Sequence, residues 1–315
     1  MEESETLRSK LKFSVVIPVF NEEGNLEVLH TRLSKVMESL GEPYEVIFID
    51  DGSTDSSFQV LKGIHQKDNS VKAIRFTRNF GQHTAIAAGL HYCRGELVVS
   101  MDADLQDQPE DIPKLLDKLN EGYEIVYALL KERQDSFMKK LSSKVYLWFL
   151  AKLTNQTINP EIPTFRMMTR RVVDYINELR ERSRFYGGLV AWLGFPYAIV
   201  PVEHGERFAG KTKYSLWKMI RLATEGIVSF SDIPLRLIGY FGLMISAASF
   251  ILGIYVLIRW FVWGIPLAGY TSIIVSIFFL GGVTLVVLGV IGRYLGGVLI
   301  EVKGRPLYVV RDVIE

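Results

Sequence analysis

Cysteine is nearly absent from the 315-residue sequence, in which Cys93 is the only one. A single cysteine excludes an internal disulfide and a metal site built from several cysteines. Net charge is also nearly absent, since 36 Lys and Arg residues stand against 35 Asp and Glu residues, and this balance argues against a nucleic-acid partner. The acidic opening, Met1–Thr6, is followed by no signal-type apolar core, so nothing there predicts export of the N-terminal region.

Formal charge is missing from two long runs in the C-terminal third, Leu237–Ile258 and Gly264–Gly292. Each run can supply the roughly 20 apolar residues that cross a bilayer. Two buried core helices are the alternative, but charge-free runs of this length exceed what a soluble domain usually needs. We therefore predict an integral membrane protein with a two-helix transmembrane hairpin over residues 235–295.

Basic residues around this hairpin predict its orientation. The connector Arg259–Tyr270 carries aromatic side chains suited to a membrane interface and a single charge. Basic residues lie instead before the first helix and after the second: Lys211, Lys213, Lys218, Arg221, Arg236, Arg293, Lys303, Arg305 and Arg311. The positive-inside rule therefore puts residues 1–213, a tail at 296–315 and both termini in the cytoplasm.

Two further segments have the apolar and polar faces of amphipathic helices. We predict that residues 214–234 form an interfacial helix at the bilayer surface, because they directly precede the first membrane helix. For Lys139–Leu153, packing on the soluble domain is an equal alternative to the surface position.

The N-terminal two-thirds of the chain alternates strand and helix patterns. Short β-branched runs predict buried parallel strands at 13–18, 44–49, 71–76 and 97–101. Apolar residues at helical spacing predict helices between them, at 25–40, 56–66 and 84–92. This βαβ alternation predicts an α/β domain with a Rossmann-like sheet.

Three of the predicted strands end in polar or acidic clusters, at Pro18–Glu22, Asp50–Ser53 and Asp102–Gln106. Ligands of open α/β sheets gather beyond the carboxyl ends of the strands, so we expect these clusters to form one active site. Within the third cluster, Asp102 and Asp104 can approach one hard divalent cation and leave its other positions to water and phosphate oxygens. An ordinary turn would explain that pair alone, but three such endings on one sheet edge favour a site.

Six segments together resemble the family 2 glycosyltransferases: Val16–Glu22, Ile49–Ser53, Asn79–Gly81, Met101–Gln106, Arg207–Tyr214 and Glu301–Tyr308. Within that family the chain is similar to the membrane-bound polyisoprenyl-phosphate glycosyltransferases, which include dolichol-phosphate mannose synthases and bacterial glucosyltransferases that charge undecaprenyl phosphate. The resemblance covers nearly the whole chain and implies a GT-A nucleotide-sugar-binding domain ahead of the membrane helices. It implies inverting transfer of a single hexose to a polyprenyl phosphate, with UDP-glucose as the first choice of donor and GDP-mannose or an aminoarabinose donor behind it.

The resemblance also implies roles for individual residues. The nucleotide-sugar donor would be bound by Pro18, Phe20, Glu22, Ile49, Asp51, Asp102, Ala103 and Gln106. A divalent cation, Mg²⁺ or Mn²⁺, would be held by Asp102, Asp104 and Gln106, because oxygen ligands suit both metals. The catalytic set would be Asp104 with Arg207 and Lys213, and the last two would also bind the lipid phosphate, although attraction to anionic lipid is the alternative for them.

Two positions depart from the family pattern. Thr164 stands where relatives carry an acidic residue before the Phe-Arg pair, and threonine cannot serve as a general base at neutral pH. Leu130 stands where relatives often carry an arginine, and Arg133, one helical turn away, is the substitute candidate for the lipid phosphate. A phosphate with a second pKa of about 6 is already a competent nucleophile near neutral pH. The missing acid therefore favours a phosphate acceptor over a sugar hydroxyl.

Two other functions remain as alternatives. A processive membrane polysaccharide synthase would share the donor chemistry, but its Gln-x-x-Arg-Trp motif and additional membrane helices are missing from the sequence. A non-catalytic membrane partner or lipid translocase would use the nucleotide-binding fold for regulation. Small residues that allow close helix packing leave homo-oligomer formation open: Gly281, Gly282, Gly289, Gly292, Gly296 and Gly297.

Overall fold

The computed structural model describes residues 11–130, 163–179, 190, 192–203, 233–263 and 269–315. These residues belong to two compact units. One unit holds a β-sheet with its helices and includes Arg305–Glu315, and the other holds two long helices.

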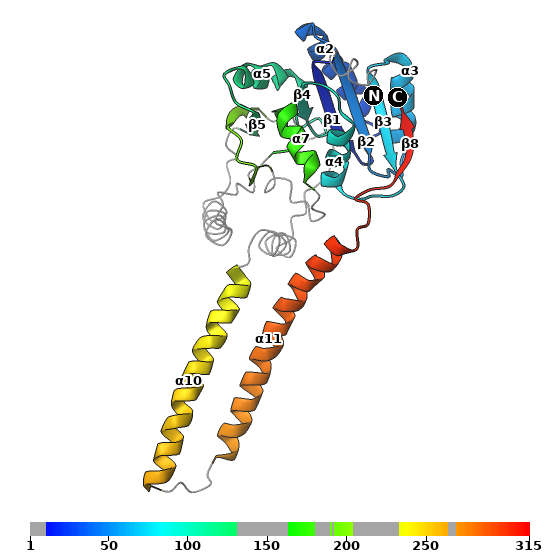
Figure 1. Cartoon of the computed structure of the whole chain (residues 1–315). Coiled ribbons are helices and arrows are strands. Elements are labelled where there is room, and N and C mark those ends of the chain that lie inside the picture. The colour runs from blue at the N-terminus through cyan, green and yellow to red at the C-terminus, as the bar shows by residue number, and fades with distance from the viewer. Residues whose placement is uncertain (1–10, 131–162, 180–189, 191, 204–232, 264–268) are drawn as a thin grey trace. The chain divides into compact units, whose positions relative to one another are not determined.

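Within the described residues, the first unit is built on an eight-stranded sheet with the order β7-β5-β6-β4-β1-β2-β3-β8 (Figure 1). Its strands are β1 (Phe13–Val19), β2 (Tyr44–Asp50), β3 (Val71–Phe76), β4 (Leu97–Ser100), β5 (Ile125–Leu130), β6 (Arg166–Thr169), β7 (Tyr197–Val202) and β8 (Val310–Ile314). β6 and β8 run antiparallel to their neighbours, whereas the other strands run parallel to one another. The central order β3-β2-β1-β4 is Rossmann-like, so the predicted α/β fold is confirmed.

Helices cover both faces of this sheet. α2 (Leu26–Leu40), α3 (Ser57–Lys67) and α5 (Ile112–Asn120) pack on one face, and α4 (Gln82–Tyr92) and α7 (Arg170–Glu178) pack on the other. Since side chains alternate along a strand, Val15 and Ile17 enter the first core while Val16 enters the second. Burial on both faces explains why the central strands are mostly apolar rather than strictly alternating.

The predicted elements of this unit agree closely with the observed ones. β1 to β4 match the predicted strands to within one residue, and α2, α3 and α4 match the predicted helices to within two. The close packing of α4 depends on a glycine, because a Cβ atom at Gly89 would overlap the Val16 side chain of β1. That packing fixes the helix that follows β3 and the loop at residues 77–81.

The C-terminal residues return to the sheet after the second long helix. β8 pairs antiparallel with β3, so that Ile74 lies opposite Val313, and it forms one edge of the sheet. The predicted boundary between hairpin and tail, residue 295, lies inside the helix α11 (Tyr270–Val302). The sequence patterns did not predict β8.

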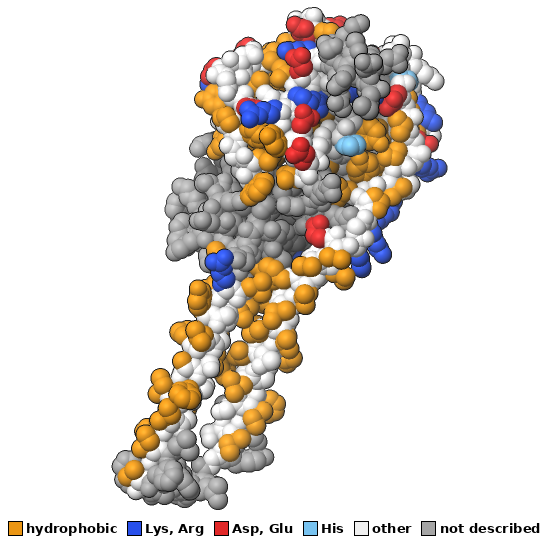
Figure 2. Space-filling model, in the orientation of Figure 1, with side chains coloured by type: hydrophobic (Ala, Val, Ile, Leu, Met, Phe, Trp, Pro, Cys, Tyr) orange, Lys and Arg blue, Asp and Glu red, His pale blue; other side chains and the backbone are white. Residues whose placement is uncertain are grey.

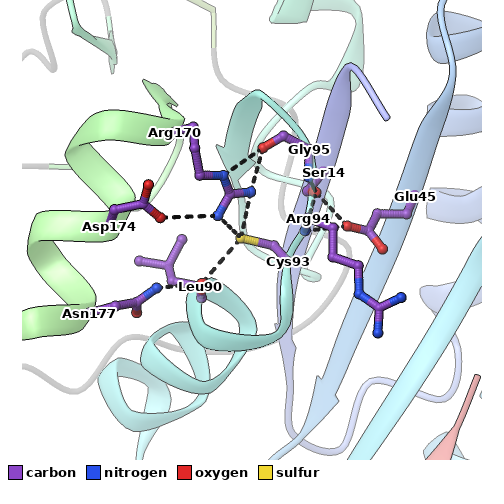
Figure 3. A network of polar contacts seen from close by, with 9 residues as sticks. All are labelled: Ser14, Glu45, Leu90, Cys93, Arg94, Gly95, Arg170, Asp174 and Asn177. Carbon is purple, nitrogen blue, oxygen red and sulfur yellow. Dashed lines mark hydrogen bonds and ion pairs between the residues drawn. The ribbon is translucent and has the colours of Figure 1, made fainter. Parts of the chain in front are cut away.

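A polar network closes the sheet edge at the amino ends of the strands (Figure 3). The buried carboxylate of Glu45 accepts hydrogen bonds from Ser14 Oγ at 2.6 Å and from the Arg94 backbone N–H at 2.6 Å, and Lys72 Nζ lies 2.9 Å from it. Arg170 at the start of α7 donates to the carbonyl of Gly95. These bonds tie the connection between α4 and β4 to the first residues of β1 and β2, on the edge opposite the predicted site.

The second unit consists of α10 (Ile233–Trp263) and α11. Each has a segment with the length and composition of a membrane span, Leu235–Tyr255 with 21 residues and Ser276–Val302 with 27, and neither segment is buried. Hydrophobic side chains line both helices along their length (Figure 2). These exposed apolar helices are consistent with membrane anchoring. The predicted interfacial helix lies outside the described residues except for its last two positions, and so does Lys139–Leu153.

Candidate active site

The loops that follow β1 and β2 are bonded to each other. The backbone N–H of Asn21 donates to Ser53 Oγ at 3.0 Å, and the Asn21 side-chain oxygen accepts from the Thr54 N–H at 2.8 Å. Asn21 adopts a left-handed conformation with φ of 57°, which asparagine tolerates better than most residues. The carboxyl ends of the two strands therefore form one rigid edge.

Two adjacent carboxylates at the end of β2 have different surroundings. Asp50 is fully buried and lies 3.2 Å from the Arg75 guanidinium, and it also accepts from the Ser53 N–H at 2.8 Å. Asp51 instead accepts backbone hydrogen bonds from Phe80 at 2.6 Å and Gly81 at 2.9 Å. Burial raises the pKa of Asp51, and those two hydrogen bonds counteract the rise. Asp50 is thus paired with the cation of Arg75, whereas Asp51 has no cation beside it among these contacts.

The loop that bonds to Asp51 also reaches the turn after β4. A Cβ atom at Gly52 would lie 2.7 Å from the backbone nitrogen of Asn79, so this loop passes directly against the end of β2. Gln82, the first residue of α4, donates from its side-chain amide to Asp102 Oδ1 at 2.6 Å. The second and third predicted clusters are therefore connected through three consecutive residues.

The turn after β4 is held in shape by its own carboxylates. The N–H of Asp102 donates to Asp107 Oδ2 at 2.8 Å, and the N–H of Gln106 donates to Asp104 Oδ1 at 3.1 Å. Leu105 has a positive φ of 64°, a conformation that strains a residue with a branched side chain. Strain of this kind persists where the surroundings impose it, and it recurs at functional sites.

Negative charge is concentrated in this acidic turn, which we define as residues 102–107. Burial, followed by the charge of Asp104, raises the pKa of Asp102 to about 6. Burial, followed by the charge of Asp102, raises the pKa of Asp107 to about 8. The buried cation of Arg166, from β6, partly offsets these effects at Asp102. The turn is thus electrostatically suited to receive positive charge.

The donor groups of the acidic turn fit a cation only in part. Among the described residues, no group of three or more His, Cys, Asp or Glu side chains is arranged to hold a metal ion. A cation bound by Asp102 and Asp104 would therefore take further oxygen ligands from a substrate or from water. The buried Gln106 Nε2 has no hydrogen-bond partner within the described structure, and such an atom suits a ligand oxygen.

The remaining predicted donor-site residues that the structure describes lie at the ends of the same strands or in the loops that follow them. Pro18 belongs to β1, Phe20 just beyond it is 45% exposed, and Glu22 is half-buried in the following loop. Ile49 and Ala103 are buried, and the Ile49 side chain packs in the second hydrophobic core. The Ile49 side chain thus belongs to the hydrophobic core beneath the sheet edge and is not exposed there.

Thr164 lies close to this edge as well. It precedes β6, whose first residue, Arg166, pairs with Ser100 at the end of β4. Three predicted residues, Arg133, Arg207 and Lys213, lie outside the described residues. Sequence reasoning missed Gln82, Asp107 and the contribution of Arg166, although Asp107 follows the acidic pair closely and Arg166 belongs to the Phe-Arg pair.

The described residues thus form an α/β domain whose central parallel strands end on an acidic edge, and two helices of membrane-spanning length. The family model described as "Glycosyl transferase family 2" matches residues 14–176, which is just over half of the chain. The chain belongs to this family, which confirms the resemblance seen in the sequence, and it is accordingly a glycosyltransferase.

Relatives match over nearly their whole length. An uncharacterized glycosyltransferase, sll0501, of Synechocystis sp. is 42% identical over 304 residues, which cover 96% of each chain. An SfII prophage-derived bactoprenol glucosyl transferase of Shigella flexneri is 39% identical over 302 residues, covering 96% of this chain and 98% of that one. Among solved structures, glucosyl-3-phosphoglycerate synthase from Mycobacterium tuberculosis in complex with Mn²⁺, UDP-glucose and phosphoglyceric acid is 20% identical, with a TM-score of 0.47, and covers 73% of this chain and 81% of that chain.

Proposed function

We propose that this protein transfers a single glucose from UDP-glucose to a membrane polyprenyl phosphate, with inversion at the anomeric carbon. The observation that carries this proposal is the connection of the acidic turn to the Asp51 loop through Gln82, which brings these two groups of carboxylates together on one sheet edge. The similarity to bactoprenol glucosyl transferases over 96% of the chain supports the choice of sugar and acceptor.

Asp51 is suited to recognise the base of the nucleotide. Its two oxygens are fixed by the N–H groups of Phe80 and Gly81, and each carboxylate oxygen can accept more than one hydrogen bond. An imide N–H of uracil would therefore find a preorganised acceptor. Phe20 offers an exposed ring beside this position on the neighbouring strand end.

Asp102 and Asp104 would hold the divalent cation, Mg²⁺ or Mn²⁺, and Gln106 would contribute beside them. The cation, when bound, would offset the charge that develops on the departing diphosphate. Gln106 Nε2 can donate to a phosphate or sugar oxygen, which would supply the partner that this buried atom lacks within the described structure. The pKa values of Asp102 and Asp107 are raised by burial and because negative charges lie close together, and a bound cation would compensate these charges.

The acceptor half of the reaction needs no general base. Thr164, close to the end of β4, cannot remove a proton at neutral pH, and a dianionic lipid phosphate does not require it. Arg207 and Lys213, with Arg133 as a third candidate, would bind that phosphate and hold the two anions together. The membrane hairpin would keep the catalytic domain and both termini on the cytoplasmic side, where UDP-glucose is available.

Acceptor-dependent turnover tests this proposal. Purified protein with a divalent cation is incubated with labelled UDP-glucose, with and without undecaprenyl phosphate, and with GDP-mannose or an aminoarabinose donor in parallel. We expect label to enter the lipid fraction as a single sugar, only with undecaprenyl phosphate and fastest with UDP-glucose. Absence of turnover would favour a non-catalytic partner or translocase, a lipid product with several sugars would favour a processive synthase, and preference for another donor would overturn the choice of glucose.

A further inference from the structure

An aromatic stack connects the C-terminal segment to the loop that holds Asp51. The ring of Tyr308 stacks on Phe76, the last residue of β3, with centroids 4.9 Å apart and planes inclined by 15°. Phe76 in turn meets the ring of Phe80 edge-on, with centroids 5.7 Å apart. On Phe80 the Arg78 guanidinium lies 4.5 Å from the ring centroid. The Phe80 ring is thus held by contacts with both Phe76 and Arg78.

Backbone bonds fix Tyr308 in this place. The Thr77 N–H donates to the carbonyl of Val309 at 3.0 Å, immediately after β3 ends, and Phe76 lies opposite Val310 in the β3–β8 ladder. The pairing of the two strands shifts register between Arg75 and Phe76. Tyr308 and Val310 both pack against the second hydrophobic core, which also contains Phe76. The position of the Tyr308 ring is therefore set by the last strand of the chain.

The same Phe80 whose ring ends this stack donates its backbone N–H to Asp51 at 2.6 Å, and Gly81 donates at 2.9 Å. The loop cannot retreat toward β2, because Gly52 already touches it so closely that a Cβ atom there would overlap its backbone. Movement of the Phe80 ring would thus change the two hydrogen bonds that orient the Asp51 carboxylate.

We propose that Tyr308 is a positioning residue for the nucleotide donor, acting through Phe76 and Phe80 on Asp51. This inference rests on the proposed function, in which Asp51 recognises the base. It adds that the donor site is complete only when the segment after α11 has paired with β3. Tyr308 lies six residues beyond Val302, the end of α11. The positioning residue therefore comes from the part of the chain that follows the second apolar helix.

Nucleotide affinity, rather than total activity, distinguishes this role from a purely structural one. A variant that only destabilises the fold lowers the amount of active protein, but leaves the Kd of the folded fraction unchanged. A variant that misplaces Asp51 raises the Kd for UDP and the KM for the donor, while the KM for the lipid acceptor stays constant. An aromatic contact of this kind is worth about three- to tenfold in affinity.

The test uses the full-length protein in detergent, with UDP and Mn²⁺ as the binding probe in titration calorimetry. We expect Tyr308→Ala to raise the Kd for UDP and the donor KM about three- to tenfold. Tyr308→Leu, which retains apolar volume for folding, should have the same effect, and Tyr308→Phe, which retains the ring, should bind as the wild type does. Val313→Ala is the matched control, because Val313 lies in β8, the strand that follows Tyr308, and is 47% exposed.

Two results would overturn the inference alone: wild-type Kd values in folded Tyr308→Ala and Tyr308→Leu, or an equal loss in Val313→Ala, which would mean general damage to β8. Absence of UDP binding by the wild-type protein would instead overturn the proposed function, and the positioning role with it. The wild-type titration therefore separates the two failures.

Discussion

Gln82 donates a hydrogen bond of 2.6 Å from its side chain to Asp102, so the first turn of α4 contacts the acidic turn that follows β4. The two residues are separated by 20 positions in the chain and meet because α4 packs closely on β1. This bond stabilises the charged form of Asp102, since hydrogen bonding to the carboxylate lowers its pKa.

Loss of this bond should weaken metal-dependent nucleotide binding. In Gln82→Ala, Asp102 loses a donor and holds its proton more tightly, so the cation competes less well for it. We expect the Kd for UDP in the presence of Mn²⁺ to rise by about tenfold, the order of one hydrogen bond to a charged group. Gln66→Ala is the control, because Gln66 is an exposed glutamine near the C-terminal end of α3, and this variant should bind like the wild type. Equal affinity in Gln82→Ala would remove this residue from the site.

The acidic turn should make metal stabilisation depend on pH. The folded-state pKa values of Asp102 and Asp107, about 6 and about 8, lie above the ordinary value of 3.8. Groups raised in this way favour the folded state fully below their unfolded pKa, and that contribution is lost as the pH rises through about 6 and then about 8. A bound cation replaces the missing protons, so we expect Mn²⁺ to raise the Tm of metal-free protein more at about pH 8 than at about pH 5.5.

Thermal unfolding of detergent-solubilised protein, with and without Mn²⁺ at each pH, checks this expectation. Asp107→Asn supplies the control, because it lacks the group with the higher pKa and should show a smaller difference between the two pH values. An equal Tm increase at both pH values in the wild-type protein would mean that these carboxylates do not bind the cation.

Cys93 should be unreactive in the folded protein. Burial raises the pKa of its thiol to about 11, although the nearby Arg170 opposes the rise, and the thiolate is the reactive form. We expect iodoacetamide at about pH 8 to leave the native protein unmodified and to alkylate Cys93 fully once the protein is unfolded in guanidinium. Mass spectrometry measures both states, and stoichiometric modification of the native protein would contradict the buried position of this side chain.

The network at the opposite sheet edge should contribute to stability and not to donor binding. Glu45→Ala would leave Ser14 Oγ and the Arg94 N–H without their buried acceptor. Such a change costs about 3 kcal/mol in the free energy of unfolding. Guanidinium unfolding followed by circular dichroism measures this loss. The Kd for UDP of the folded variant should stay at the wild-type value, and a large increase would place the network in the donor site.

The central fold was predictable from the sequence because β1 to β4 are largely buried on both faces and are therefore mostly apolar. β8 could not be predicted from the sequence, because it is not buried on both faces. It is a short edge strand that contains Arg311 and Asp312, and only its pairing with β3 makes it a strand. Its place in the sheet depends on a contact between segments that are more than 200 residues apart.

The site could be predicted where its functional side chains lie close together in the sequence. Asp102 and Asp104 stand out because two carboxylates directly follow an apolar strand. The bond from Gln82 and the support of Asp51 by Phe80 were not readable, because both depend on how α4 packs against the sheet. Arg133, Arg207 and Lys213 remain predictions from the family resemblance.

Glucosyl transfer by Asp104→Ala tests the central claim most directly, because that claim assigns a metal-bound diphosphate to the acidic turn. The assay measures label moving from UDP-glucose to undecaprenyl phosphate, with Asp117→Ala, an exposed carboxylate on α5, as the matched control. We predict wild-type transfer by the control and a loss of about 10³-fold in Asp104→Ala, equivalent to roughly 4 kcal/mol of transition-state stabilisation. Undiminished transfer by Asp104→Ala, or by the wild-type protein in metal-depleted buffer, would contradict the account.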